Sequence, residues 1–340
     1  MNASLPLLDV KDLMVRFRAA GAGIPFTRPR YINAVNGVSL TVAPGETLGI
    51  VGESGCGKST LGRAILNLVE FESGAVRFEG GEVSARDKAA IARLRGETAM
   101  IFQDPYGSLN PRIPIGEAIA EVLRVHRKVG ADAVPARVAE LLRLVGLTPD
   151  LAGRRPHQLS GGQCQRVGIA RALAVEPRLI IADECVAALD VSIQAQILNL
   201  LMELQRRMNL ALIFISHDLG VVRHLCRRVA VMYLGRIVEL GPTEQVFSAP
   251  RHPYTRALLA AVPDIDPDRL LAPPQLGGEP PSPQDLPSGC PFHPRCPHAQ
   301  TACARGNAPT LRATIPGDLR AGEVACHFDL PPDTQQGEDP

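Results

Sequence analysis

One stretch of the chain decides the fold, and it reads Gly52-Glu53-Ser54-Gly55-Cys56-Gly57-Lys58-Ser59-Thr60. Its pattern, G-x-x-x-x-G-K-S, is that of a P-loop, in which glycines bring backbone N–H groups close to phosphate. Lys58 supplies a positive charge for the outer phosphates, and the Ser59 hydroxyl can hold Mg²⁺. The apolar run at 47–51 predicts a buried strand before the loop, and apolar residues at helical spacing over 59–67 predict a helix after it. The stretch therefore predicts a site for a nucleoside triphosphate.

Composition excludes several other classes of protein. At 340 residues the chain can form one large domain and a smaller appendage. The formal net charge is +1, so there is no basic field for nucleic acid. No apolar run approaches the roughly 20 residues that a membrane helix needs. Residues 1–11 lack a basic region followed by an apolar core, so we expect no signal peptide and a cytosolic location.

Apolar patterning predicts an alternation of strands and helices. Strands are predicted at 7–17, 34–42, 99–102, 178–183, 210–215, 229–233 and 236–240, with a hairpin at 74–82 and an exposed loop at 19–30. Helices are predicted at 115–125, 136–145 and 193–208. The first two of these helices indicate a helical insert carried on an α/β core.

Two carboxylates end the predicted strand at 178–183. Asp183 is placed to hold Mg²⁺ directly or indirectly, at the sheet edge beside the P-loop. Glu184 is placed to act as the general base that polarises the attacking water. His217 follows the strand at 210–215, and we expect it to contact the γ-phosphate.

A second glycine-rich turn lies at Leu159-Ser160-Gly161-Gly162-Gln163 and opens a helix. Ser160 is a good N-cap, and the two glycines allow an anion to approach the positive end of that helix. One nucleotide cannot easily use two such sites in one chain. A second copy, or a homologue, is therefore expected to place this turn over the ATP of the first chain.

Together these motifs resemble those of the nucleotide-binding subunits of ABC transporters. The P-loop, Gln103, the turn at 159–163 (the signature turn), Asp183-Glu184, Ala188-Leu189-Asp190 and His217 follow the order and spacing of that family over about residues 7–245. The resemblance implies an α/β fold: an ABC-type P-loop NTPase with a mixed-sheet core, an antiparallel β part and a helical subdomain at about 104–172. It also implies a head-to-tail dimer, in which each of two ATP molecules lies between one chain's P-loop and the other chain's signature turn.

The resemblance further implies roles for single residues. Gln103 would sense Mg²⁺ and water, Glu184 would be the catalytic base, His217 would steady the γ-phosphate, and Asp190 would communicate across the dimer. An aromatic residue should stack on adenine; Phe17 is in the family position, and Tyr31 is its rival. The expected nucleotide contacts are Gly52, Ser54, Gly55, Cys56, Gly57, Lys58, Ser59, Thr60, Gln103, Asp183, Ser160, Gly161, Gly162, Gln163 and Asp190, and the expected Mg²⁺ ligands are Ser59, Gln103 and Asp183.

Four of the eight cysteines crowd one Pro-rich segment: Cys290, Cys296, Cys303 and Cys326. They are separated by five, six and 22 residues, whereas zinc sites usually show closer pairs and ferredoxins tighter spacings. In a cytosolic chain the cluster favours a metal over disulfides or free thiols, without identifying the metal. His293, His298 and His327 lie near enough in sequence to keep a mixed zinc site open.

Two further stretches narrow the resemblance. His252-Pro253-Tyr254-Thr255-Arg256-Ala257-Leu258 and Gly289-Cys290-Pro291-Phe292-His293-Pro294-Arg295-Cys296 resemble the C-terminal extension of the oligopeptide/dipeptide/nickel importer group. That resemblance favours a [4Fe–4S] cluster with a structural or regulatory role. It divides the chain into a nucleotide-binding domain at 1–248, an extension at 249–330 and a disordered tail at 331–340.

The function expected from this resemblance is ATP hydrolysis that drives uptake of di- or oligopeptides. The implied partners are a second ATPase subunit, two membrane permeases that dock near Gln103, and an external substrate-binding protein, with the chain peripheral on the cytoplasmic face of the membrane. Nickel or glutathione-type cargo is the alternative within the group. A soluble ABC ATPase of DNA repair or translation is the alternative outside it, although no coiled-coil insertion or basic stripe supports that class.

Some residues depart from the family pattern. Cys164 stands where Arg or Lys is usual, Cys185 where Pro is usual, and Ala187 replaces a common Ser. None of these changes removes a catalytic group. We expect Cys185 to be a buried, inert thiol, although its position also makes it a candidate for oxidation.

Overall fold

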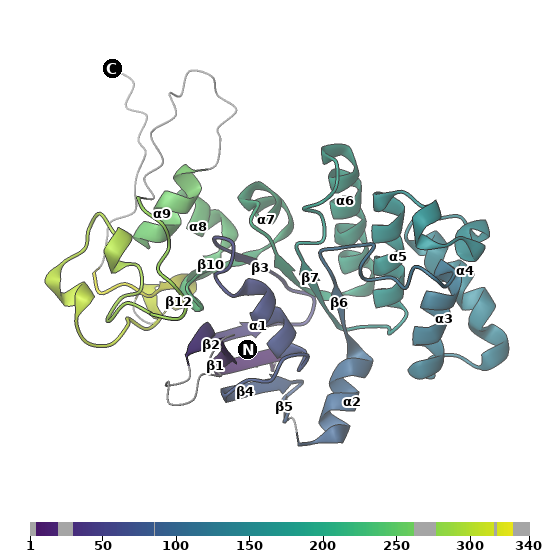
Figure 1. The fold of residues 1–340 in the computed structure, drawn as a ribbon, viewed down its shortest axis with the longest axis horizontal. Helices are drawn as coiled ribbons and strands as arrows, with labels where there is room; N and C mark the ends of the chain where they lie inside the picture. The colour runs from purple at the N-terminus through teal and green to yellow at the C-terminus, as the bar shows by residue number, and fades with distance from the viewer. Residues whose placement is uncertain (1–4, 20–29, 85, 262–276, 316–317, 329–340) are drawn as a thin grey trace, which may run out of the picture. The chain divides into compact units, whose positions relative to one another are not determined.

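The structure is a computed structural model that describes residues 5–19, 30–84, 86–261, 277–315 and 318–328. Its contacts divide the chain into two compact units. The first unit comprises Met1–Asp9, Thr41–Thr47 and Val76–Ile215, and the second comprises Val10–Leu40, Leu48–Ala75 and Ser216–Pro340. None of the helices in the described ranges is long and apolar enough to cross a membrane. Figure 1 labels most of the helices and strands of both units.

The second unit contains the P-loop between β3 (Thr47–Val51) and α1 (Lys58–Ile65). Every residue of β3 is buried, which explains its continuous apolar sequence, and β3 pairs in parallel with β9 (Arg228–Tyr233). A tight turn at Leu234 and Gly235, both at positive φ, leads into the antiparallel strand β10 (Arg236–Pro242). The strands predicted at 229–233 and 236–240 are thus confirmed, and they form a hairpin.

Beyond β10 the sheet of the second unit continues into the C-terminal extension. β12 (Asp318–Val324) pairs antiparallel with β10, and β11 (Arg312–Ile315) pairs antiparallel with β12. The unit also holds most of β1 (Leu8–Arg18) and of its neighbour β2 (Tyr31–Val42), and the helices α7 (Leu219–Leu225), α8 (Thr243–Ser248) and α9 (Pro253–Ala260). Two 3-10 turns, η4 (His293–Arg295) and η5 (Thr301–Ala304), carry much of the cysteine-rich segment.

The first unit is built on three parallel strands, β6 (Thr98–Ile101), β7 (Leu179–Asp183) and β8 (Ala211–Ile215). All residues of β7 and β8 are buried, as their apolar sequences predict. The long helix α6 (Val191–Met208) connects these two strands as a crossover. The unit also contains the short strand β5 (Gly81–Glu82), which pairs with the end of β4 (Ser73–Phe78), and α2 (Lys88–Glu97).

The helical insert is part of the first unit. Figure 1 shows α3 (Ile115–Val125), α4 (Val134–Leu144) and α5 (Gly161–Leu173) gathered side by side. Short 3-10 turns join them: η1 (Ala131–Ala133), η2 (Pro149–Gly153) and η3 (Pro156–Gln158). The apolar side chains of the helix predicted at 136–145 are buried, with Val138 at 6%, Leu141 at 1%, and Leu142 and the C-cap residue Val145 at 0% exposure. The insert therefore has its own small core.

Most predicted elements are confirmed within three residues of their expected ends, and α3 and β3 have the predicted bounds. The sequence patterns missed α2, α7, α8, β11 and β12. α2 buries one apolar side chain, Leu94, so it shows no apolar stripe. Most of the loop expected at 19–30 and all of the tail expected at 331–340 lie outside the described residues.

Candidate active site

The P-loop has the backbone that its glycines predict. Gly52 has φ 150° and Gly57 has φ 104°, both outside the range that side-chain-bearing residues readily adopt. A Cβ at Gly52 would lie 2.1 Å from the Met232 carbonyl oxygen, and one at Gly57 would lie 2.0 Å from the Ala34 carbonyl oxygen. Both positions therefore require glycine, and the loop from Gly52 to Thr60 forms the expected turn between β3 and α1.

Lys58 is held at the centre of this loop. Its side chain is buried, and Nζ donates to the carbonyl oxygens of Gly52 at 2.8 Å and Glu53 at 2.9 Å. Cys56 Sγ lies 3.9 Å from the same ammonium, and burial raises the pKa of this thiol although Lys58 opposes the shift. The loop thus concentrates positive charge at the first residue of α1, which is the anion-binding end of the helix.

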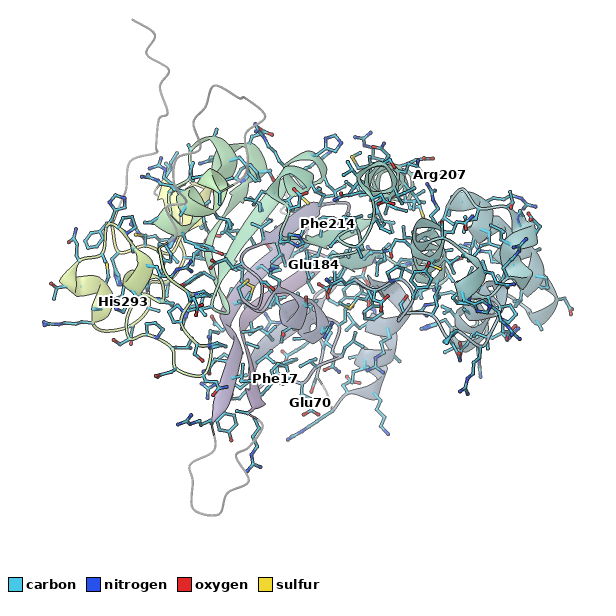
Figure 2. All side chains as sticks on the ribbon, turned by 45° about the horizontal axis from the view of Figure 1, so that its top comes forward. Phe17, Glu70, Glu184, Arg207, Phe214 and His293 are labelled. Carbon is cyan, nitrogen blue, oxygen red and sulfur yellow. The ribbon has the colours of Figure 1, made fainter. Side chains whose placement is uncertain are left out.

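A carboxylate–amide pair lies at the carboxyl end of β7 in the first unit. Gln103 Nε2 donates to Glu184 Oε2 at 2.9 Å. Asp183 is buried and ends β7. The next residue is Glu184, which Figure 2 labels. Its φ is 45°, a left-handed backbone that non-glycine residues seldom adopt, and its N–H donates to the Ile215 carbonyl oxygen at 2.9 Å. The structure therefore brings together the predicted base and the predicted Mg²⁺-sensing glutamine.

The signature turn forms a capped helix start in the same unit. Ser160 Oγ accepts from the Gln163 N–H at 3.3 Å, and Gln163 Oε1 accepts from the Ser160 N–H at 3.0 Å, which is a reciprocal capping box. A Cβ at Gly162 would lie 2.6 Å from Ile193 Cγ2 on α6, so this glycine permits close packing of α5 on α6. Cys164 is fully buried, and its Sγ lies 3.5 Å from the Pro156 carbonyl oxygen. The turn has the geometry expected of an anion-binding helix end.

The remaining site residues lie at exposed positions. Asp190 precedes the first residue of α6, and His217 lies between Ser216 and Asp218, the residue that caps α7. The P-loop and His217 belong to the second unit, whereas Gln103, Asp183, Glu184, Asp190 and the signature turn belong to the first.

Both candidates for the adenine contact are exposed aromatic residues at one end of the β1–β2 pair. Phe17 lies near the end of β1 and is 39% exposed, and Tyr31 begins β2 and is 44% exposed. The Ala19 N–H donates to the Arg30 carbonyl oxygen at 2.9 Å, so the two aromatic residues lie at the same end of these strands. Figure 2 labels Phe17 there. Each side chain is available to a planar base.

The four cysteines of the extension line one pocket. Its other walls are His252, Pro253, Phe292, His293, His298, His327 and Phe328. Burial raises the pKa of Cys290 to about 11, and the nearby thiols of Cys303, Cys326 and Cys296 contribute to the shift. All eight cysteines are unpaired, so the disulfide alternative is wrong for this structure. Among the described residues no three His, Cys, Asp or Glu side chains are close enough to hold a single metal ion.

Three residues at the P-loop were not identified from sequence. Glu53 occupies one of the variable positions of the loop, and it pairs with Arg295, 242 residues later. Tyr254 was noted only as part of a family marker, and its hydroxyl oxygen accepts from the Glu53 N–H at 2.8 Å. An acidic residue at a variable P-loop position was the available signal, but sequence spacing does not indicate its partner.

The His-Pro-Tyr marker also acquires a structural reason. His252 Nδ1 accepts from the Tyr254 N–H at 3.0 Å and caps α9, where Pro253 is the first residue. Burial lowers the pKa of His252 to about 3, so the ring is a neutral acceptor. The buried carboxylate of Glu239 accepts from the N–H groups of Arg251 at 2.8 Å and His252 at 2.9 Å. These contacts fix the helix that presents Tyr254.

Comparison with known proteins gives two family matches, one in the N-terminal part and one in the C-terminal part of the chain. Residues 35–187 match the family described as ABC transporter, and residues 238–303 match the family described as oligopeptide/dipeptide transporter, C-terminal region. The oligopeptide transport ATP-binding protein OppF of Escherichia coli is 53% identical over 324 residues, which cover 94% of this chain and 95% of that protein. A probable peptide ABC transporter ATP-binding protein of Sinorhizobium fredii is also 53% identical, with 96% and 90% coverage.

Solved structures extend the comparison to the fold. The cbiO1 protein of Clostridium perfringens, part of the ABC transporter complex cbiONQ, matches with a TM-score of 0.61 at 29% identity, covering 71% of this chain and 90% of that one. A dimeric ATP-binding cassette in a post-hydrolysis state, bound to ADP and phosphate, matches with a TM-score of 0.62 at 27% identity, covering 69% and 98%.

Proposed function

Because this chain belongs to the ABC transporter ATP-binding proteins of the oligopeptide/dipeptide importer group, we propose that its ATPase activity drives the uptake of di- or oligopeptides through membrane permeases. The chain is an ABC ATPase coupled to transport. The match of residues 238–303 to the oligopeptide/dipeptide extension carries the choice of cargo. Nickel or glutathione-type cargo is the alternative within the group.

The proposed chemistry assigns each motif one task. Lys58 and the backbone N–H groups of the P-loop bind the β- and γ-phosphates, and Ser59 and Asp183 hold Mg²⁺. Glu184 accepts the proton of the attacking water, and Gln103 orients its carboxylate through the 2.9 Å hydrogen bond. His217 contacts the γ-phosphate. The paired geometry of Gln103 and Glu184 supports this assignment.

We propose that each site is completed by a second ATPase subunit, either another copy of this chain or a homologue. The capped signature turn at Ser160 would lie over the partner's triphosphate, where the N–H groups at the start of α5 face negative charge. Asp190 directly precedes α6, the helix that packs against the signature turn, and it would lie at the boundary between the subunits. The dimeric cassette with the same fold supports this arrangement.

We further propose that Cys290, Cys296, Cys303 and Cys326 hold a [4Fe–4S] cluster. Four unpaired thiols in one pocket with Phe292 and Phe328 fit a group that needs four thiolates and shelter from water. When bound, the cluster supplies a four-point cross-link and a one-electron couple. Optical absorption in the visible with about four iron atoms per chain is expected, and zinc in place of iron would contradict the assignment.

The permeases and an external substrate-binding protein are the remaining proposed partners. The chain would lie on the cytoplasmic face of the membrane, and the helical insert of α3, α4 and α5 near Gln103 would receive the permeases. We also propose the division of the chain into a nucleotide-binding domain at 1–248 and an extension at 249–330.

Transport reconstituted in membrane vesicles tests this function. The subunit, co-purified with its permeases and binding protein, should support ATP-dependent uptake of a labelled tripeptide, and Lys58→Ala should abolish that uptake together with ATP turnover. Uptake of nickel or glutathione without peptide would change the cargo. ATPase stimulation by DNA or ribosomes, without co-purifying permeases, would overturn the transport assignment.

A further inference from the structure

An arginine of the C-terminal extension forms an ion pair with the side chain of a P-loop residue. Arg295 donates two hydrogen bonds to the Glu53 carboxylate, from Nη1 at 2.8 Å and from Nη2 at 3.0 Å. The Arg295 side chain is 5% exposed and that of Glu53 is 25% exposed. The pairing raises the pKa of Arg295 above its ordinary value. A two-point pair between a nearly buried guanidinium and a carboxylate is strong and directional, unlike most surface ion pairs.

The extension also holds the backbone of the same P-loop residue. The Tyr254 hydroxyl oxygen accepts from the Glu53 N–H at 2.8 Å. The carbonyl oxygen of Glu53 in turn accepts from Lys58 Nζ at 2.9 Å. Glu53 is therefore fixed at three points, and one of them is the ammonium that binds the outer phosphates.

Aromatic packing holds the side chains of Arg295 and Tyr254 in place. The Arg295 guanidinium lies 5.8 Å from the centre of the Tyr233 ring, and the Tyr233 and Tyr254 rings are 4.7 Å apart. Phe292 contacts both rings, at 5.3 Å and 5.5 Å between centroids. Tyr233, Tyr254 and Phe292 are at most 1% exposed. Because the cluster is fully packed, it holds the Arg295 and Tyr254 side chains in their positions on Glu53.

The charge of Glu53 gives this contact a functional consequence. A carboxylate in a phosphate-binding loop repels a triphosphate unless a cation neutralises it. Arg295 is the cation that neutralises it here, and it comes from the extension rather than from the nucleotide-binding domain. We propose that Arg295 and Tyr254 are positioning residues for the P-loop, so that ATP affinity depends on contacts supplied by the C-terminal extension.

Charge-pair variants measured by nucleotide affinity test this proposal. Arg295→Gln leaves the Glu53 carboxylate unpaired, and the full chain should then bind mant-ATP about tenfold more weakly, since breaking a largely buried charged pair has a large effect. KM for ATP should rise in parallel, whereas kcat should change less. The double variant Glu53→Gln, Arg295→Gln removes both charges and should recover most of the affinity. Arg295→Lys restores the charge without the two-point geometry and should be intermediate.

A matched control separates this role from general stabilisation of the extension. Arg305 is an exposed arginine of the same extension, and Arg305→Gln should leave the mant-ATP Kd and the urea unfolding midpoint unchanged. Hydrogen exchange supplies a readout independent of turnover. ATP should slow exchange across residues 290–296 in the wild type, because coupling between two sites is reciprocal, and it should not do so in the Arg295→Gln variant.

The outcomes that overturn the proposal are specific. A folded Arg295→Gln variant with the wild-type Kd would overturn it, as would a double variant that binds no better than Arg295→Gln alone. If Arg295→Gln does not fold, Tyr254→Phe keeps the packed ring and removes the acceptor for the Glu53 N–H. That variant should bind mant-ATP several-fold more weakly, on the order of the loss expected for one buried hydrogen bond, and unchanged affinity in it would be equally decisive against the proposal.

Discussion

Replacing Glu184 with glutamine should separate ATP binding from ATP hydrolysis. The Gln103 amide donates to Glu184 Oε2 at 2.9 Å, and a glutamine side chain at 184 keeps an oxygen that can accept this bond. The backbone at this residue is left-handed, with φ 45°, and the substitution introduces no change in side-chain size there. The change therefore removes one property, the ability of the carboxylate to accept a proton from water.

The size of the effect follows from that single loss. General-base catalysis contributes about 100- to 10,000-fold, which corresponds to about 3–5.5 kcal/mol of transition-state stabilisation. We expect kcat to fall by at least about 100-fold, while the Kd for ATP stays within about twofold because no phosphate contact is lost. Gln103→Ala should give a smaller fall in kcat, since it leaves the base in place and removes only the group that orients it.

Two measurements check this expectation. Phosphate release at saturating Mg-ATP gives kcat, and equilibrium binding of mant-ATP gives the Kd. Near-normal turnover in the Glu184→Gln variant would refute the assignment of the base. Light scattering adds a test of the shared site: the variant, alone or with its sister ATPase subunit and permeases, should dimerise with ATP, and a persistent monomer under all these conditions would refute the dimeric arrangement.

Three other predictions concern the remaining parts of the molecule. Of Phe17→Ala and Tyr31→Ala, one should weaken ATP binding by about 1–3 kcal/mol, the range for loss of a base-stacking partner, and titration with mant-ATP identifies which; unchanged affinity in both would exclude the pair. Cys185, whose pKa burial raises to about 12, should resist iodoacetamide at pH 8 in the native chain and react in urea, as read by mass spectrometry. Cys303→Ser should lower the iron content and the visible absorption of the purified chain. Its affinity for nucleotide should be no lower than that of a wild-type sample from which the cluster has been removed. Full iron content would show that this thiol is not a ligand.

The core of the fold was predictable because its signals are local. The strands β3, β7 and β8 are buried on both faces and are therefore continuous apolar runs in the sequence. β12 could not be found in the same way. Its sequence, DLRAGEV, mixes three charged residues and a glycine with three apolar residues, and it becomes a strand by pairing with β10, where Val324 lies opposite Glu239. Such pairing depends on residues far away in the chain, which no local pattern reports.

The candidate catalytic motifs could be recognised in the sequence because each requires a fixed local spacing. A P-loop needs glycine where the backbone approaches another carbonyl closely, and Gly52 and Gly57 satisfy that need against Met232 and Ala34. The family resemblance implied separate roles for Gln103 and Glu184, but nothing in the sequence predicted the hydrogen bond between these residues, which lie 81 positions apart. Local spacing thus identified the parts of the site but not how side chains from distant segments meet.

The variable positions of the P-loop are where this chain differs from the minimum that the motif requires. The glycines and Lys58 would bind phosphate in any protein of this class, whereas Glu53 adds a negative charge that opposes binding unless it is neutralised. The same carboxylate makes the loop responsive to another part of the chain, because Arg295, directly before Cys296, supplies the compensating charge. A loop with a neutral residue at position 53 would not need the charge of Arg295 in order to bind ATP. On the proposal made above, the pair therefore has a role beyond stability: it makes the affinity for nucleotide depend on a charge that the cysteine-rich segment supplies.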